Sequence, residues 1–170
     1  MKQEIIVIAA VSNNYVIGVE GKIPWRIKED MDHFKKLTTP HPIIMGRVTY
    51  ESIPQKFRPL PGRHKVVLTG NTSFRDEGVQ VVHSLEDALH VLGDRSSSQD
   101  GIDYSKIYIG GGQQVYQQAM PHATKLEITH VDQTVQGLEM RSFPQIDPKL
   151  WKEQNRENKQ GYSFVTYVGK

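Results

Sequence analysis

Short apolar runs alternate with amphipathic stretches along most of this chain, a pattern typical of a parallel sheet with helices packed on both faces. The last part of the chain is rich in strands without helices between them, which predicts an antiparallel edge. We therefore predict an α/β fold: a mixed, mainly parallel central sheet of about eight strands, helices on both faces and an antiparallel C-terminal edge. Predicted strands are 5–11, 43–45, 65–69, 79–82, 106–109, 126–131 and 162–168, with a weaker one near Trp151, and predicted helices are 27–37, 47–53, 84–92 and 113–120.

Length and composition exclude several classes of protein. A chain of 170 residues suits one domain, 1–170, and the absence of cysteine excludes disulfides, thiolate zinc sites and a cysteine nucleophile. With 21 Lys+Arg against 19 Asp+Glu, the chain lacks the basic surface of a nucleic-acid-binding protein. Its longest apolar run, Ile5 to Val11, is shorter than the ~20 residues of a membrane helix. The seven histidines form no recognisable ligand motif, so we expect no metal.

One acid lies on the wrong face of a predicted helix. Projection of 27–37 as a helix places Asp30 inside the apolar stripe, while the other polar residues, His33 among them, occupy the remaining arc. Burial of an unpaired carboxylate costs several kcal/mol, so Asp30 needs a hydrogen-bond partner, a raised pKa or a cavity that admits a polar ligand. The alternative is a first-turn acid favoured by the helix dipole, which does not require the apolar face. The stripe consists of Ile27, Met31, Phe34 and Leu37.

Glycine occupies two predicted strand-to-helix junctions, at Gly46 and at 110–112. Helix N-termini at the carboxyl ends of strands bind phosphate, and two of them could clasp a diphosphate, with Arg47 as a further phosphate contact. A tight turn of purely structural origin is the alternative. Neither junction matches the G-x-G-x-x-G fingerprint and there is no phosphate-binding P-loop, which disfavours a Rossmann dehydrogenase and a P-loop ATPase. No G-x-S-x-G motif offers a nucleophile.

Seven segments in register give the chain a resemblance to a known family. They are IIVIAAVSNNYVIGVEGKIPW (5–25), the helix with Asp30 and Phe34, PIIMGRVTYESI (42–53), RPLPGR (58–63), GGQQVY (111–116), LEITHV (126–131) and FP (143–144). Over essentially its whole length the chain resembles bacterial dihydrofolate reductase. The resemblance implies NADPH-dependent reduction of 7,8-dihydrofolate to 5,6,7,8-tetrahydrofolate, which supports one-carbon metabolism and thymidylate synthesis. Hydride would pass from nicotinamide C4 to pterin C6, with protonation of N5 and water as the proximal proton donor.

The same resemblance implies roles for individual residues. Asp30 would hydrogen-bond the pterin amino group and ring nitrogen, supported by Thr129, and Trp25 would hold an active-site water and the mobile loop 13–25. Arg63 would pair with the α-carboxylate of the substrate's glutamate tail, a bidentate contact for which lysine is a poor substitute. The implied substrate-binding residues are Ile8, Ala10, Asp30, Met31, Phe34, Ile53, Leu60, Arg63, Gly110 and Thr129.

For the cofactor, NADPH, the resemblance implies the two glycine junctions, the mobile loop and the turn near residue 70. Gly110 departs from the family, which usually has a branched apolar residue there, unless a different register brings in Ile109. The stretch 137–144 replaces a shorter family segment. The implied cofactor-binding residues are Ala10, Ile17, Gly18, Gly46, Arg47, Val48, Thr49, Leu68, Thr69, Gly70, Asn71, Gly111, Gly112, Gln113, Gln114, Val115 and Tyr116.

Three alternatives remain open at this point. Another reductase of the same fold, such as one from the riboflavin pathway, would not need Asp30 together with Arg63. A non-catalytic folate- or nucleotide-binding protein would bind both ligands without turnover, and a nucleic-acid module would need a basic stripe. We expect dihydrofolate as the substrate, antifolate inhibitors as ligands, no nucleic acid or membrane partner, a monomer and a cytoplasmic location.

Overall fold

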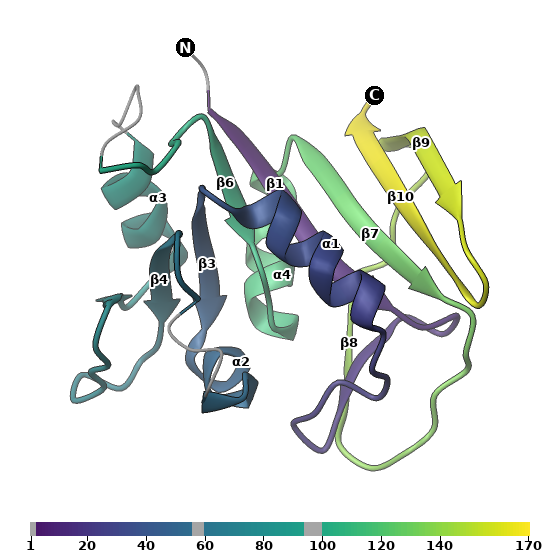
Figure 1. The fold of residues 1–170 in the computed structure, drawn as a ribbon, viewed down its shortest axis with the longest axis horizontal. Helices are drawn as coiled ribbons and strands as arrows, with labels where there is room; N and C mark the ends of the chain where they lie inside the picture. The colour runs from purple at the N-terminus through teal and green to yellow at the C-terminus, as the bar shows by residue number, and fades with distance from the viewer. Residues whose placement is uncertain (1–2, 56–59, 94–99) are drawn as a thin grey trace.

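The computed structural model describes residues 3–55, 60–93 and 100–170. Its centre is an eight-stranded sheet in the order β5-β4-β3-β6-β1-β7-β10-β9 (Figure 1). All pairs from β5 to β7 are parallel, whereas β10 is antiparallel to both β7 and β9. The predicted fold class is confirmed. The strands are β1 (Glu4–Val11), β3 (Pro42–Gly46), β4 (His64–Leu68), β5 (Val79–Val82), β6 (Lys106–Ile109), β7 (Lys125–Val131), β9 (Trp151–Asn158) and β10 (Tyr162–Gly169).

Helices cover both faces because side chains alternate along each strand. In β1, Ile6 and Ile8 pack on one face with Phe34, while Val7 and Ala9 pack on the other with Ala119. The first face carries α1 (Lys28–Thr38) and α2 (Arg47–Ser52). The second carries α3 (Leu85–Gly93), α4 (Gln113–Ala119) and the short 3-10 helix η2 (Met120–His122). Figure 1 shows α1 in front of the sheet and α4 behind it.

Most element boundaries agree with the sequence prediction within one residue. The Ser84 hydroxyl accepts a hydrogen bond from the Asp87 N–H at 3.0 Å and so caps the N-terminus of α3. The predicted helix 113–120 ends at Ala119, and Pro121 lies inside η2. Residues 56–59 and 94–99, which follow the predicted helices 47–53 and 84–92, lie outside the described part of the chain.

Two short strands were not predicted. β2 (Val16–Val19), inside the loop 13–25 that the family resemblance implies, pairs antiparallel with β8 (Met140–Ser142). We call this two-stranded sheet the β2–β8 ribbon. Side-chain and main-chain bonds fix its ends: Asn14 exchanges two hydrogen bonds with the Val135 backbone, at 2.9 and 3.0 Å, and the Gln113 side chain accepts the Ser142 N–H at 2.7 Å.

The weak strand predicted near Trp151 is an eight-residue edge strand, β9. Only Trp151 is buried in it; the next seven residues are exposed and largely charged or polar. Such a composition discourages the unpaired edge of a sheet from pairing with another chain. No helix in the described ranges is both long and apolar enough to cross a bilayer.

Candidate active site

Asp30 and Thr129 meet although 99 residues separate them. Asp30 lies in the first turn of α1, and α1 crosses the face of β7 from which Thr129 projects. The Thr129 hydroxyl donates a hydrogen bond to Asp30 Oδ1 at 2.6 Å. Burial raises the pKa of Asp30, while the Thr129 bond and the charge of His33 act in the opposite direction. The acid on the apolar stripe therefore has both a partner and a perturbed pKa, as its position predicted.

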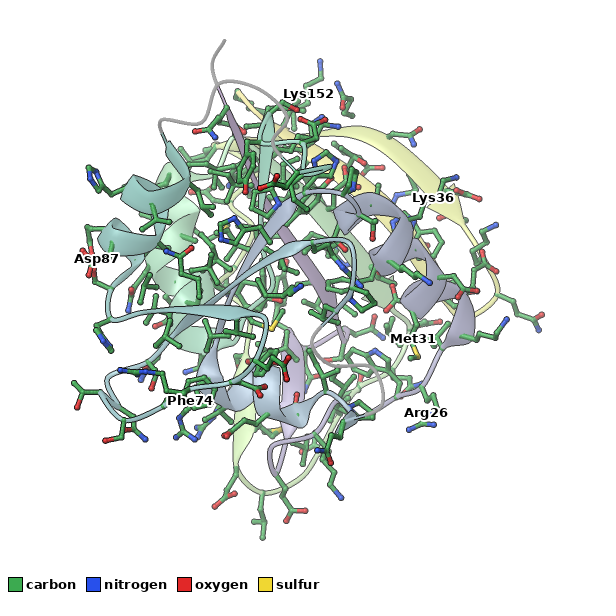
Figure 2. The ribbon with its side chains drawn as sticks, turned by 60° about the vertical axis from the view of Figure 1, so that its left-hand side comes forward. Arg26, Met31, Lys36, Phe74, Asp87 and Lys152 are labelled. Atoms are coloured by element: carbon green, nitrogen blue, oxygen red, sulfur yellow. The ribbon has the colours of Figure 1, made fainter. Side chains whose placement is uncertain are left out.

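An apolar wall continues from Asp30 along the same face of the sheet. Ile8 and Leu60 are buried there, and Phe34 and Ile53 pack against them. Met31, predicted to line the same pocket, lies in the first turn of α1, shortly after Arg26 (Figure 2). It is 48% exposed. A carboxyl group beside such a wall suits a flat heterocycle with polar edges.

The position of Gly110 settles the register of the glycine junction. A Cβ on Gly110 would lie 3.3 Å from Ile43 Cδ1 and 3.5 Å from Met45 Cε, both on the Asp30 face. Ile109 is fully buried in the core on the opposite face, so it cannot replace Gly110 in the pocket wall. Gly110, and not Ile109, therefore occupies the position on the Asp30 face, where the buried side chains of Ile43 and Met45 lie against it.

Arg63 is a buried cation that has no anionic partner among the residues the structure describes. It is 5% exposed, and Nη1 donates to the Thr38 hydroxyl at 3.0 Å. Nε has no partner in the described part of the chain, and no carboxylate of that part pairs with the guanidinium group. Burial lowers the pKa of Arg63, and the Arg63 charge in turn helps to lower the pKa of Lys65. A buried guanidinium group in this state is a ready site for a carboxylate ligand.

Trp25 also carries an unused donor. Its indole Nε1 is buried and has no hydrogen-bond partner among the residues described. A buried N–H of this kind costs free energy unless water or a ligand accepts it. The observation agrees with the predicted role of Trp25 as the holder of an active-site water.

The two glycine junctions lie side by side at the ends of β3 and β6. The Gly46 N–H donates to the Gly111 carbonyl at 2.7 Å. Gly46 and Gly112 are the N-cap residues of α2 and α4, and neither helix has a side-chain cap. The first-turn N–H groups of both helices therefore remain for an anion such as a diphosphate. A Cβ on Gly112 would lie 2.9 Å from the Thr49 hydroxyl, so this close approach requires glycine.

Replacement of Gly111 by alanine should destabilise the fold. Gly111 has φ +104°, and an added Cβ would lie 2.9 Å from the buried ring of Tyr116. We expect Gly111→Ala to lower the free energy of unfolding by about 3 kcal/mol in urea denaturation, because strain and overpacking add. Gly93→Ala is the control, since a Cβ added there would meet nothing within 4 Å. Equal stability of the two variants would contradict this expectation.

The other predicted cofactor residues fall into two groups. Thr69, Gly70 and Asn71 form a turn after β4, in which the Thr69 hydroxyl accepts the Asn71 N–H at 3.0 Å. The same group contains residues at strand ends and on the ribbon: Leu68 ends β4, and Ile17 and Gly18 lie on β2. It also contains the half-buried Ala10 of β1 and the exposed Val48 and Gln114. By contrast, Val115 and Tyr116 are buried in the α4 core, where the Tyr116 hydroxyl donates to the Ile8 carbonyl at 2.8 Å. These two residues shape the site through packing.

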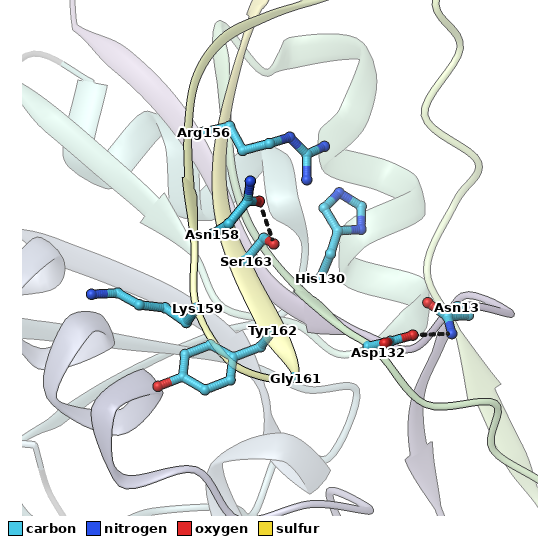
Figure 3. A pocket seen from close by; sticks show the side chains of 9 residues that line it. All are labelled: Asn13, His130, Asp132, Arg156, Asn158, Lys159, Gly161, Tyr162 and Ser163. Carbon is cyan, nitrogen blue, oxygen red and sulfur yellow. Dashed lines mark hydrogen bonds between the residues drawn. The ribbon is translucent and has the colours of Figure 1, made fainter.

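A polar hollow of about 320 Å³ lies near the β9–β10 edge (Figure 3). His130 and Ser163 line it and are paired across the strands, so they face away from the side on which Thr129 and Phe164 meet α1. Its cations are already paired: Arg156 with Glu153, and Lys159 with Glu29 and Glu157. The hollow lacks the apolar wall and the available charge found around Asp30. Among the residues described, no group of three acids or histidines is arranged to hold a metal ion.

A buried carboxyl group beside an apolar wall, near two helix N-termini that could accept a diphosphate, is the arrangement expected of an oxidoreductase that holds a heterocyclic substrate against a dinucleotide. The family model for dihydrofolate reductase matches residues 4–168. The chain is 40% identical to the dihydrofolate reductase of Neisseria gonorrhoeae, over 98% of this chain and 99% of that one. It is also 40% identical to dihydrofolate reductase HdrB of Haloferax volcanii, over 97% and 83%. The chain belongs to the dihydrofolate reductase family.

A solved structure gives the same result. Dihydrofolate reductase from Enterococcus faecalis, complexed with NADP(H) and RAB-propyl, superposes with a TM-score of 0.80 at 30% identity, over 98% of this chain and 96% of that one. The chain is thus an NADPH-dependent oxidoreductase that reduces dihydrofolate to tetrahydrofolate. The riboflavin-pathway alternative and the nucleic-acid alternative are not supported.

Proposed function

We propose that Asp30, Thr129, Trp25 and Arg63 carry out this reduction, with NADPH held at the two glycine junctions. The bond between Thr129 and Asp30 beside the apolar wall is the observation that carries the proposal. Asp30 would accept hydrogen bonds from the pterin amino group and ring nitrogen, and Thr129 would hold its carboxyl group in place. The apolar wall would bury the two faces of the ring and exclude water from it.

The chemistry needs no covalent step. Bound at the two glycine junctions, NADPH would supply the hydride for pterin C6, and a proton would reach N5, which would yield tetrahydrofolate and NADP⁺. The negative charge of Asp30 favours protonation of the ring system, and the free Trp25 N–H would orient the water next to it. Arg63 would fix the far end of the substrate by pairing with a tail carboxylate. The protein contributes position and electrostatics.

Oxidation of NADPH in the presence of dihydrofolate, followed by absorbance, tests the proposal. Turnover that is lost in Asp30→Asn would support it. Tight binding of both ligands without oxidation would favour the non-catalytic alternative, and binding of neither would show that the site residues are wrong.

Preference for NADPH over NADH should depend on Arg47. Its Nη1 pairs with Glu51 Oε1 at 2.6 Å, one turn further along α2, and both side chains are partly exposed. We expect Arg47→Leu to raise the KM for NADPH about tenfold and to leave the KM for NADH unchanged, because only NADPH carries a 2′-phosphate on its adenosine ribose. Glu51→Gln, which frees Arg47, is the control and should not raise the KM for NADPH. Equal effects on both cofactors would contradict this role.

We also propose a cytoplasmic monomer of one domain, 1–170, without nucleic acid or membrane partners. A single eight-stranded sheet forms the centre of the described residues, with only the two-stranded β2–β8 ribbon beside it, and the formal net charge is only +2. NADPH-dependent chemistry is typical of the cytoplasm. Sedimentation should give a mass near 19.4 kDa, and twice that mass would contradict the monomer.

A further inference from the structure

His33 lies one helical turn after Asp30 on α1 and is held there by an aromatic contact. Its ring stacks on Phe164 of β10, with the centroids 3.9 Å apart and the planes 14° from parallel. The strand pairing places Phe164 opposite Thr129, the residue that bonds Asp30. His33 is half-buried, because β10 partly covers the polar arc of the helix on which the projection places it. Phe164 thus holds a titratable ring beside the Asp30 carboxyl group.

Some of the charged groups around His33 already form ion pairs with other residues, and others do not. On α1, His33 faces Asp30, Glu29 and Lys36, and from β9 it faces Glu157. Glu29 and Glu157 both pair with Lys159, at 3.1 and 2.7 Å. The Tyr162 hydroxyl also donates to Glu29, at 3.1 Å.

Asp30 differs from these two acids. Within the described ranges its side chain bonds only the Thr129 hydroxyl, which is neutral, and no lysine or arginine pairs with it. Its electrostatic neighbour is therefore His33. Burial lowers the pKa of His33, whereas the charges of Asp30 and Glu157 raise it. The charge of each group thus favours the charged form of the other.

We propose that His33 is a positioning residue for Asp30: held flat against Phe164 one helical turn away, its protonated ring keeps the neighbouring carboxyl group ionised. The catalytic consequence rests on the proposed role of Asp30. Protonated His33 stabilises the Asp30 charge, so the ionised acid persists to lower pH than burial alone would allow. Above the pH at which His33 loses its proton, the ring is neutral and this effect disappears.

The experiment measures both titrations directly, without turnover. In ¹³C and ¹H NMR of the full chain, His33→Phe keeps an aromatic ring against Phe164 and should move the Asp30 titration to higher pH. Reciprocally, Asp30→Asn should move the His33 titration to lower pH, which a change in burial around Asp30 would not produce. His33→Gln, a polar neutral replacement, should repeat the first shift even if His33→Phe disturbs packing. Asp32→Asn, an exposed acid on the same helix, should change neither titration.

Activity gives the second measurement. Relative to the unmodified chain, kcat/KM of His33→Gln should be about twofold lower at about pH 5.5 and equal at about pH 8, as expected for a charge pair one helical turn apart. Glu157→Gln should produce a smaller loss of the same sign, because it weakens protonation of His33. An Asp30 titration that is the same with and without His33 would overturn the proposal, whatever the enzyme's activity. Coupled titrations in a chain that does not reduce dihydrofolate would support the proposed pair and refute only the proposed function.

Discussion

Asp30→Asn should reduce turnover of dihydrofolate by about 10²- to 10³-fold at neutral pH, because the substituted amide cannot supply the negative charge that favours protonation of the pterin. The amide oxygen can still accept the Thr129 hydrogen bond, so the site should keep its shape. Steady-state kinetics with NADPH and dihydrofolate measures the effect. Asp32→Asn is the matched control: it removes an exposed acid from the same helix and should leave turnover unchanged.

Two further measurements separate this role from a structural one. The deficit of Asp30→Asn should shrink as the pH falls, since the medium then supplies the proton. In the folded chain burial raises the pKa of Asp30 above its unfolded value, so the ionised group opposes folding at neutral pH. Asp30→Asn should therefore be at least as stable as the unmodified chain at neutral pH in urea denaturation. Retention of more than about a tenth of the activity would move the essential acid elsewhere.

Arg63→Met should separate binding from stability. Loss of the guanidinium group removes the partner of the substrate's tail carboxylate, and we expect the KM for dihydrofolate to rise about 10²-fold with little change in kcat. The same substitution removes a buried cation that no anion pairs within residues 3–55, 60–93 and 100–170, so the free energy of unfolding should rise. Stability and affinity then change in opposite directions.

The substrate itself provides the sharpest control for Arg63. A reduced pterin without a glutamate tail should be turned over equally by the unmodified chain and by Arg63→Met. Arg75→Met is the matched variant, because Arg75 is exposed and bonds only the carbonyls of Thr72 and Phe74 in the described part of the chain. An equal rise in KM for the tailless pterin would contradict a role in tail recognition.

The hydrophobic pattern of one helix was enough to identify Asp30 as a candidate site residue. A charged residue inside an apolar stripe can be recognised from the helix sequence alone, without knowledge of the residue it contacts. The strands of the parallel sheet were equally visible, since strands buried on both faces are continuous apolar runs such as Ile5 to Val11. Thr129 was found only through the resemblance to a family. Threonine suits any strand, and its bond to Asp30 depends on the crossing of α1 over β7.

Elements stabilised by distant pairing could not be predicted in this way. β2 and β8 contain four and three residues, and each acquires its strand geometry from a partner more than 120 residues away. β9 has almost no apolar pattern because it is an exposed edge. The partial burial of His33 was not predicted for a related reason. It comes from Phe164 on β10, which a projection of the helix alone does not include.

The β2–β8 ribbon connects the loop that must move during ligand exchange to residues 137–142, which lie more than 110 residues further along the chain. Residues 12–24 cannot swing as a free flap, because main-chain pairs join Val16 to Ser142 and Val19 to Met140, and Gly137 packs so tightly on Val19 that a Cβ would lie 2.6 Å from its methyl carbon. For the loop to open, the backbone pairs between β2 and β8 must break one after another. We therefore expect the residence time of a bound inhibitor to respond to substitutions at 137–142, even though none of these residues belongs to the folate pocket.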